Sequence, residues 1–180
     1  AVTLLLLKAG IKDVIVTDSV GAIVKGRAGM APYKEELARR SNPRKIAGSV
    51  ADAVSGADVI IGVSGPGTIS RGHIETMAKD AIVFALANPI PEILPEDAFN
   101  AGACVVATGR SDYPNQVNNA LAFPGIFRGA LDTGVKKITD EIKLAAARKI
   151  ASLVKRPSAG EIVPKVTFPG LVKAVASVIR

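Results

Sequence analysis

The sequence has no tryptophan, a single cysteine and only 4% aromatic residues. One cysteine excludes a disulfide framework and is typical of a reducing compartment, so we expect a cytoplasmic protein. Apolar runs such as Leu4–Leu7 are far too short to cross a bilayer, and nothing resembles a cleavable signal peptide, so we expect no membrane association. The scattered aromatic residues offer no stacking platform for bases, so we expect no nucleic-acid partner despite the net charge of +7.

The apolar residues that are present make up 48% of the 180 residues, and valine, isoleucine, leucine and alanine dominate among them. This composition is typical of strands that helices cover on both faces, and the length suits one domain. The positive charge suits a small anionic ligand. The chain begins at Ala1, without a methionine and within a helical pattern, so we expect it to be part of a longer polypeptide.

Four apolar segments predict buried strands at Asp13–Asp18, Asp58–Val63, Ala81–Leu86 and Cys104–Ala107. Helical patterns precede, separate or follow them, at residues 1–10, 32–40, 50–54, 70–77, 95–102 and 124–132, from 139 onward, and at 169–180. Strands that alternate with helices in this way indicate a parallel sheet of the α/β class. Within the last strand, we expect Cys104 to be a packed core thiol rather than a nucleophile.

Polar or small residues follow three of these strands at the point where each strand ends. Ser64 and Gly65 follow the second strand, Asn88 follows the third, and Ser111 and Asp112 follow the fourth. Open parallel sheets bind ligands outside the carboxyl ends of their strands, so the three clusters predict one binding cleft at that edge. Small residues at positions 64 and 65 would let the backbone come close to a bound cofactor.

The first predicted strand ends in Asp18, where a dinucleotide-binding unit places the acid that binds the adenosine ribose hydroxyls. In such a unit the segment that ends in Asp18 is the second strand. The first strand of the unit and its G-x-G-x-x-G turn would lie before Ala1. The sequence therefore predicts a Rossmann-like, doubly wound parallel sheet that lacks its first strand and its glycine-rich turn. A carboxylate at position 18 favours NAD, while Lys25 and Arg27 would make NADP possible. The alternative for Asp18 is a strand-end carboxylate that only forms a turn.

A dense group of amides follows the last predicted strand. Three asparagines and a glutamine lie between Asn115 and Asn119. No packing requirement explains this density, and amides supply a ligand with both donors and acceptors. Together with Asp112 and two arginines, they are what a site for a small acid needs. The alternative is an ordinary polar loop between a strand and a helix.

The whole stretch Gly109–Gly129 resembles the signature of malic enzymes of the short bacterial and archaeal type, and the resemblance extends along nearly the whole chain. Ile90, after Asn88 and Pro89, departs from the family form known best, which has threonine there. The resemblance implies oxidative decarboxylation of (S)-malate to pyruvate and CO₂ with NAD or NADP and a divalent Mg²⁺ or Mn²⁺. In the family, the proton-transferring lysine and tyrosine and the acidic metal ligands all lie upstream of the glycine-rich turn. The resemblance therefore implies no catalytic residue and no metal ligand within this chain.

The resemblance also implies that Asn88 lies between the nicotinamide and the substrate. We expect Asn118 and Asn119 to donate hydrogen bonds to a malate carboxylate and to fix its pose for hydride transfer. The remaining contacts with the dinucleotide are expected from Asp18, Ser64 and Gly65. Side chains that act on one substrate must converge, so we expect the three asparagines to lie over one shared cleft.

Residues 1–155 are expected to form an incomplete dinucleotide-binding domain, and residues 156–180 a C-terminal connector and helix. In the full-length protein we expect malate as substrate and a homo-oligomer, a homodimer in the simplest case, whereas the isolated chain should be inactive. Two alternatives stay open. One is the dinucleotide-binding domain of a related amino-acid or folate dehydrogenase, which would not need the Asn118–Asn119 pair. The other is a non-catalytic, dinucleotide-binding regulatory module.

Overall fold

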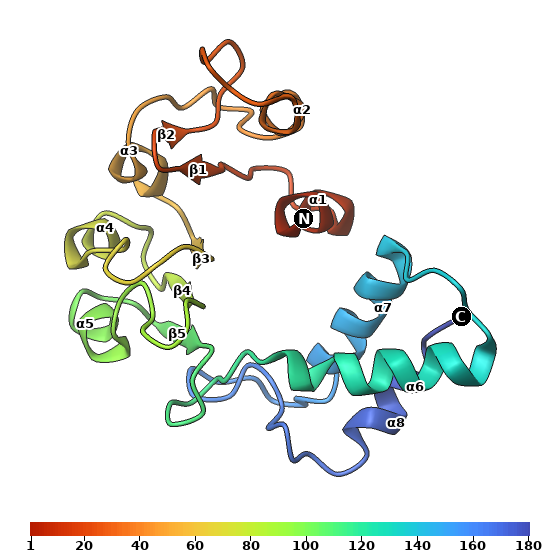
Figure 1. Ribbon diagram of the computed structural model, residues 1–180. Coiled ribbons are helices and arrows are strands. Elements are labelled where there is room, and N and C mark those ends of the chain that lie inside the picture. The colour runs from red at the N-terminus through yellow and green to blue at the C-terminus, as the bar shows by residue number, and fades with distance from the viewer. The chain divides into compact units, whose positions relative to one another are not determined.

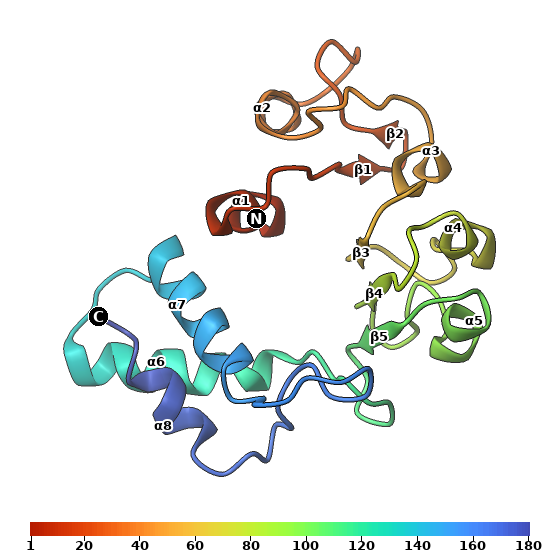
Figure 2. The same cartoon turned by 180° about the vertical axis from the view of Figure 1, so that it is seen from behind.

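Three short parallel strands form a sheet in the computed structural model, which describes residues 1–180. They are β3 (Val59–Gly62), β4 (Ile82–Ala85) and β5 (Val105–Thr108), and they lie in the order β3-β4-β5. The connections contain α4 (Arg71–Glu75) and α5 (Pro95–Asn100), which lie on the same side of the sheet in Figures 1 and 2. The predicted parallel α/β sheet is therefore confirmed.

Side chains of the sheet alternate in burial along β4. Val83 and Ala85 are 0% exposed, whereas Ile82 and Phe84 are half-buried, as expected if α4 and α5 cover one face. All four residues of β5 are buried. Cys104, however, is exposed, so the expectation of a packed core thiol is wrong. The ladder begins one residue later, and Cys104 lies at the end of the sheet rather than between its layers.

Contacts divide the chain into two compact units. The N-terminal unit comprises Ala1–Ala57 and Thr76–Ala78, and the C-terminal unit comprises Asp58–Glu75 and Lys79–Arg180. The predicted boundary after residue 155 stays a prediction. None of the helices has the length and apolar character needed to cross a membrane.

Local sequence signals account for the elements of the N-terminal unit, which are α1 (Val2–Ala9), β1 (Thr17–Asp18), β2 (Gly21–Ala22), α2 (Pro32–Arg40) and α3 (Val50–Val54). Gly10 ends α1 with a left-handed φ of 104°, which glycine adopts without a steric penalty. Pro32 occupies the first turn of α2, where its missing N–H is not needed. Ser49 and Asp52 form a capping box at the start of α3.

The strand predicted at Asp13–Asp18 is only partly correct. Strand pairing is confined to Thr17–Asp18, which forms an antiparallel hairpin with β2 instead of joining a parallel sheet. The backbone before it is held by loop amides, because the N–H of Asn42 donates to the carbonyl of Val14 at 2.7 Å and that of Ile23 to the carbonyl of Val16 at 2.7 Å. An apolar run becomes a ladder only where a neighbouring strand supplies the partners.

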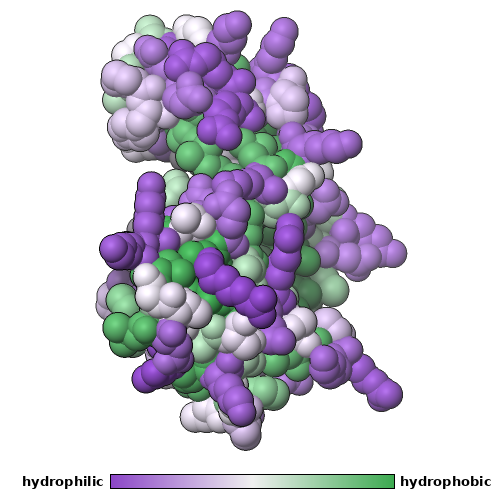
Figure 3. Space-filling model, turned by 90° about the vertical axis from the view of Figure 1, so that its right-hand side faces the viewer, coloured by the Kyte–Doolittle hydropathy of each residue, from purple (hydrophilic) through white to green (hydrophobic).

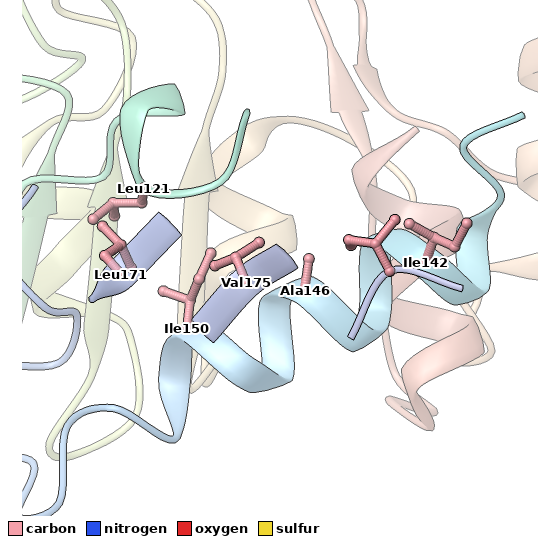
Figure 4. Packing of buried hydrophobic residues seen from close by; sticks show 7 residues of the cluster. Leu121, Ile142, Ala146, Ile150, Leu171 and Val175 are labelled. Atoms are coloured by element: carbon pink, nitrogen blue, oxygen red, sulfur yellow. The ribbon is translucent and has the colours of Figure 1, made fainter. Parts of the chain in front are cut away.

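Four helical elements follow the sheet. They are the 3₁₀ helix η1 (Asn119–Leu121), α6 (Phe123–Thr133), α7 (Asp140–Ala151) and α8 (Leu171–Ala176). Thr139 caps α7, its side chain accepting a hydrogen bond from the N–H of Ile142. Seven buried side chains form one core among these elements (Figure 4): Leu121, Ile142, Ala146, Ile150, Leu171, Val175 and Ile179. The apolar side of α7, with Ile142, Ala146 and Ile150, therefore faces this core.

Two glycines let α6 approach α8 closely. A Cβ added to Gly125 would clash with the side chain of Val175, and one added to Gly129 would lie 2.7 Å from the carbonyl oxygen of Ala176. Real Cβ atoms do not approach other atoms so closely. Both glycines belong to the stretch that resembles the malic enzyme signature, so part of that stretch serves helix packing.

Hydrophobic surface also remains exposed. Figure 3 shows one face of the molecule, on which such surface lies between long hydrophilic side chains. On α6, Phe123, Phe127 and Leu131 are exposed and recur every four residues, so they form one stripe along the helix. The rings of Phe123 and Phe127 meet edge to face with centroids 6.1 Å apart.

Candidate cofactor and substrate site

The three parallel strands end at the same edge of the sheet, because Gly62 pairs with Ala85 and Ala85 with Thr108 at the last ladder positions. The structure places Ser64 and Gly65 just beyond β3 and Asn88 just beyond β4. A Cβ added to Gly65 would meet nothing within 4 Å, so the backbone there is open to the approach of a ligand. This edge is where open parallel sheets bind ligands.

Arg110 organises the loop that follows β5. Its guanidinium donates two hydrogen bonds to Asp112, at 2.9 and 2.6 Å, and lies 5.3 Å from the ring centroid of Tyr113. These hydrogen bonds hold the pKa of the Asp112 carboxyl below its usual range and raise the pKa of Arg110. Arg110 also donates to the carbonyl of Pro89 at 3.5 Å, which connects this loop to the loop after β4. Asp112 therefore shapes the loop.

Asn115 is a structural residue, which corrects the view that no packing requirement explains the amides. It is buried, and its φ of 56° is a left-handed value that asparagine tolerates better than most residues. Its amide nitrogen donates to the carbonyls of Val106 at 3.0 Å and Ala159 at 2.8 Å, and its oxygen accepts from the N–H of Ile162 at 2.9 Å. Asn115 thus joins β5 to a distant turn of the chain.

Asn118 and Asn119 keep donor groups available at the surface. The Oδ1 of Asn118 accepts a hydrogen bond from the N–H of Ala120 at 2.9 Å and so caps η1, which leaves its NH₂ group as the free end. Asn119 is exposed, and its carboxamide forms no hydrogen bond within the chain. The same holds for Asn88, whose peptide bond to Pro89 is cis. These amides have the capacity that a ligand carboxylate requires.

Ser64 has partners within the chain that the sequence did not reveal. Its N–H donates to the Oε1 of Glu92 at 2.7 Å, and its hydroxyl lies 3.2 Å from the same oxygen and 2.8 Å from the Oγ1 of Thr68. The N–H of Ala87 donates to the Oε2 of Glu92 at 2.9 Å. Glu92, the central member of this network, was missed because a single acid between Pro91 and Ile93 carries only a weak signal in the sequence.

Asp18 lies in the N-terminal unit and is paired with two cations there. Oδ1 accepts from the N–H of Val20 at 2.9 Å and Nη1 of Arg27 at 2.9 Å, and Oδ2 accepts from Nη2 of Arg27 at 2.6 Å and Nζ of Lys34 at 2.5 Å. Hydrogen bonds from Arg27, and then from Lys34, hold the pKa of the Asp18 carboxyl well below its usual range. Because a carboxylate offers about four acceptor positions, this one is saturated.

The side chains of the chain do not fit a divalent metal. No group of three or more histidine, cysteine, aspartate or glutamate side chains is arranged to hold one. The only histidine, His73, lies in α4, where its Nδ1 accepts a hydrogen bond from the N–H of Ser70 at 3.2 Å. No chemical step is therefore assigned to a metal bound by this chain.

A parallel α/β sheet with open backbone at Gly65 and unbonded amide groups beyond its strand ends is the arrangement of a dinucleotide-binding domain. The family described as "Malic enzyme, NAD binding domain" matches residues 5–177. The chain therefore belongs to the malic enzyme NAD-binding domain family, and the resemblance seen in the sequence is confirmed.

Individual relatives support the same family. A bifunctional malic/malolactic enzyme of Bacillus subtilis (strain 168) is 51% identical, over 98% of this chain and 45% of its own length. An NADP-dependent malic enzyme of Rhizobium meliloti (strain 1021) is 47% identical, over 80% of this chain and 19% of its own length. The crystal structure of an NAD-dependent malic enzyme from Thermotoga maritima matches with a TM-score of 0.91 at 40% identity, over 97% of this chain and 46% of that one. The chain thus spans less than half the length of these relatives.

Proposed function

We propose that this chain is the cofactor- and substrate-binding part of an enzyme that oxidises (S)-malate to pyruvate and CO₂. The observation that carries the proposal is the set of uncommitted amide donors beyond the parallel strands, on Asn88, Asn118 and Asn119. Family membership decides against a related amino-acid or folate dehydrogenase.

Each of these groups has a distinct role in the proposal. A bound nicotinamide cofactor would accept the hydride. Asn118 and Asn119 hold a malate carboxylate through their NH₂ groups, and Asn88 contacts both the nicotinamide and the substrate. Ser64 and Gly65 contact the dinucleotide, for which the open backbone at Gly65 leaves room. Fixing the reactants in this way lowers the entropic part of the barrier.

Asp18 supports NAD as the cofactor, with NADP accommodated. A ribose hydroxyl can bind this saturated carboxylate only if one of its donors leaves, and Lys34, on a flexible side chain that is 26% exposed, leaves most easily. If NADP binds instead, Lys34 and Arg27 can turn from the carboxylate to the 2′-phosphate. The similarity of the chain both to a relative named as NAD-dependent and to one named as NADP-dependent supports a site that accepts either cofactor.

The remaining chemistry belongs to residues outside this chain. The binding of Mg²⁺ or Mn²⁺ is assigned to them, because no group of three or more histidine, cysteine, aspartate or glutamate side chains here could hold a metal. Proton transfer is assigned to them because the lysine and tyrosine that malic enzymes use lie upstream of the glycine-rich turn. The isolated chain should therefore not turn over malate. The complete enzyme is proposed to be a cytoplasmic homodimer.

The test is steady-state kinetics of the complete enzyme with Asn118→Asp. Aspartate keeps the oxygen that caps η1 but replaces the NH₂ donor by a negative charge that repels a carboxylate. The KM for malate should rise at least about tenfold, while the KM for the dinucleotide stays unchanged. Asn100→Asp, on the exposed end of α5, is the matched control. An unchanged KM for malate would remove Asn118 from the substrate site, and a complete enzyme without malate turnover would favour the regulatory module.

A further inference from the structure

Glu92 is a fully buried carboxylate, 0% exposed, in the turn after β4. No ion pair compensates its charge, and its three hydrogen-bond donors are the backbone N–H of Ser64, the hydroxyl of Ser64 and the backbone N–H of Ala87. A buried charge without a cation is tolerated only where directed donors replace water. The turn is therefore built around this carboxylate.

The two backbone donors are equivalent positions on neighbouring strands. The parallel ladder pairs Gly62 with Ala85 at its last position, so Ser64 and Ala87 each lie two residues beyond it. There the strand-to-strand hydrogen bonds stop, and each oxygen of Glu92 accepts one of the N–H groups left over. The carboxylate thus continues the link between the strands past the end of the sheet.

Two further contacts fix the position of Glu92 itself. A Cβ added to Gly62 would lie 2.6 Å from the carboxyl carbon of Glu92, so only glycine leaves room for it at this point of β3. The backbone carbonyl of Glu92 accepts a hydrogen bond from the N–H of Ile69 at 3.3 Å, which ties down the far end of the loop after β3. The loops after β3 and β4 therefore meet at one residue.

We propose that Glu92 is a positioning residue of the cofactor and substrate site. It sets the separation between Ser64–Gly65, which contact the dinucleotide, and Asn88, which contacts nicotinamide and substrate. The proposal rests on the proposed function for the roles of those residues. Glu92 itself is buried and touches neither ligand.

Glu92→Gln in the complete enzyme tests the proposal. Glutamine keeps the volume and one accepting oxygen, but its NH₂ group must face the N–H of either Ser64 or Ala87. The KM for malate and the Kd for NAD, measured by calorimetry without malate, should each rise about tenfold. A merely structural role would lower the melting temperature and the folded fraction but leave both constants of the folded enzyme unchanged. The matched control is Glu75→Gln, an exposed carboxylate at the end of α4, which should change neither constant.

Gly62→Ala provides a second, independent route. It keeps the charge of Glu92 and displaces its carboxyl group, so it should raise the same two constants. In the double variant the effects should be smaller than their sum, since both changes break one contact. The proposal is overturned if the folded variants retain the wild-type Kd for NAD and KM for malate. If Glu92→Gln does not fold, the Kd and KM of Gly62→Ala alone decide whether the proposal holds. The Kd for NAD is independent of turnover, so a wild-type enzyme without malate oxidation would refute the proposed function and not this role.

Discussion

Replacing Gly129 with alanine would push a methyl group into α8. The added Cβ would lie 2.7 Å from the carbonyl oxygen of Ala176 and 2.7 Å from the Cβ of Ile179. Non-bonded carbon atoms prefer separations of about 3.5–4.0 Å. The carbonyl of Ala176, the last residue of α8, is held by a hydrogen bond from the N–H of Ile179 at 3.1 Å. The helices α6 and α8 would therefore have to move apart and lose contacts in the core they share.

Two opposing effects decide the size of the change. Overpacking a core costs about 1–3 kcal/mol, and the rigid backbone at this contact favours the upper half of that range. Alanine inside a helix is more favourable than glycine by about 0.5–1 kcal/mol. We therefore expect Gly129→Ala to lower the free energy of unfolding by about 1–2 kcal/mol, equivalent to a fall of about 3–6 °C in Tm for a chain of this size.

The assay is urea unfolding followed by circular dichroism, with Gly72→Ala as the control. Gly72 lies in α4, and the nearest atom to an added Cβ there is the Oγ of Ser70 at 3.8 Å, so this alanine should be neutral or stabilising. If both variants were as stable as the wild type, the close approach of α6 and α8 would be refuted. In the complete enzyme, Gly129→Ala should leave KM unchanged, because this glycine packs on a helix and not on a ligand.

Three further predictions concern polar side chains with partners inside the chain. Asn115→Ala leaves three backbone groups without partners and should lower the unfolding free energy in urea titrations by about 3 kcal/mol or more, whereas exposed Asn100→Ala should have little effect. Lys34→Met frees the Asp18 carboxylate for a ribose and removes a donor to a 2′-phosphate. In the complete enzyme, the ratio of kcat/KM for NAD to kcat/KM for NADP should therefore rise about tenfold. An unchanged ratio would show that Lys34 does not contact the cofactor. Arg27 and Lys34 hold the pKa of Asp18 below its usual range, so Asp18 stabilises the fold above the ordinary aspartate pKa of about 3.9 and loses this contribution as the pH falls below it. Urea midpoints at about pH 5 and about pH 3 should therefore differ less in Asp18→Asn than in the wild type, and an equal difference would contradict the pairing.

Elements specified by local signals could be predicted from the sequence almost to the residue. α2 spans Pro32–Arg40 as expected, since proline favours the first turn of a helix. α3 begins at the predicted residue 50 and α7 at residue 140, each directly after a residue that favours the N-cap position, Ser49 and Thr139. The three parallel strands follow from apolar runs of strand length separated by helical patterns. All of these signals lie within a few residues of the element that they specify.

Contacts between distant segments could not be predicted in this way. Asn115 binds the backbone of Ala159, 44 residues along the chain, and Glu92 binds Ser64, 28 residues before it. In the sequence both look like polar loop residues, and only the fold buries them. The prediction of a parallel strand before Asp18 was wrong for a related reason. A strand needs a neighbouring strand to pair with, and the pattern of one segment does not reveal that neighbour.

The polar groups at the strand ends divide into those bonded within the chain and those left for a ligand. The side chains of Ser64 and Asp112 have internal partners, and Arg110, the only cation between residues 109 and 119, is committed to Asp112. The free amide donors, on Asn88, Asn118 and Asn119, are neutral. A malate dianion bound as proposed would therefore find donors here that fix its orientation, while its charge would have to be balanced by groups outside these loops. A carboxylate placed at position 118 would then repel the substrate, with no free cation on the loop to offset the repulsion. Asn118→Asp should therefore weaken the binding of malate without changing the stability of the fold.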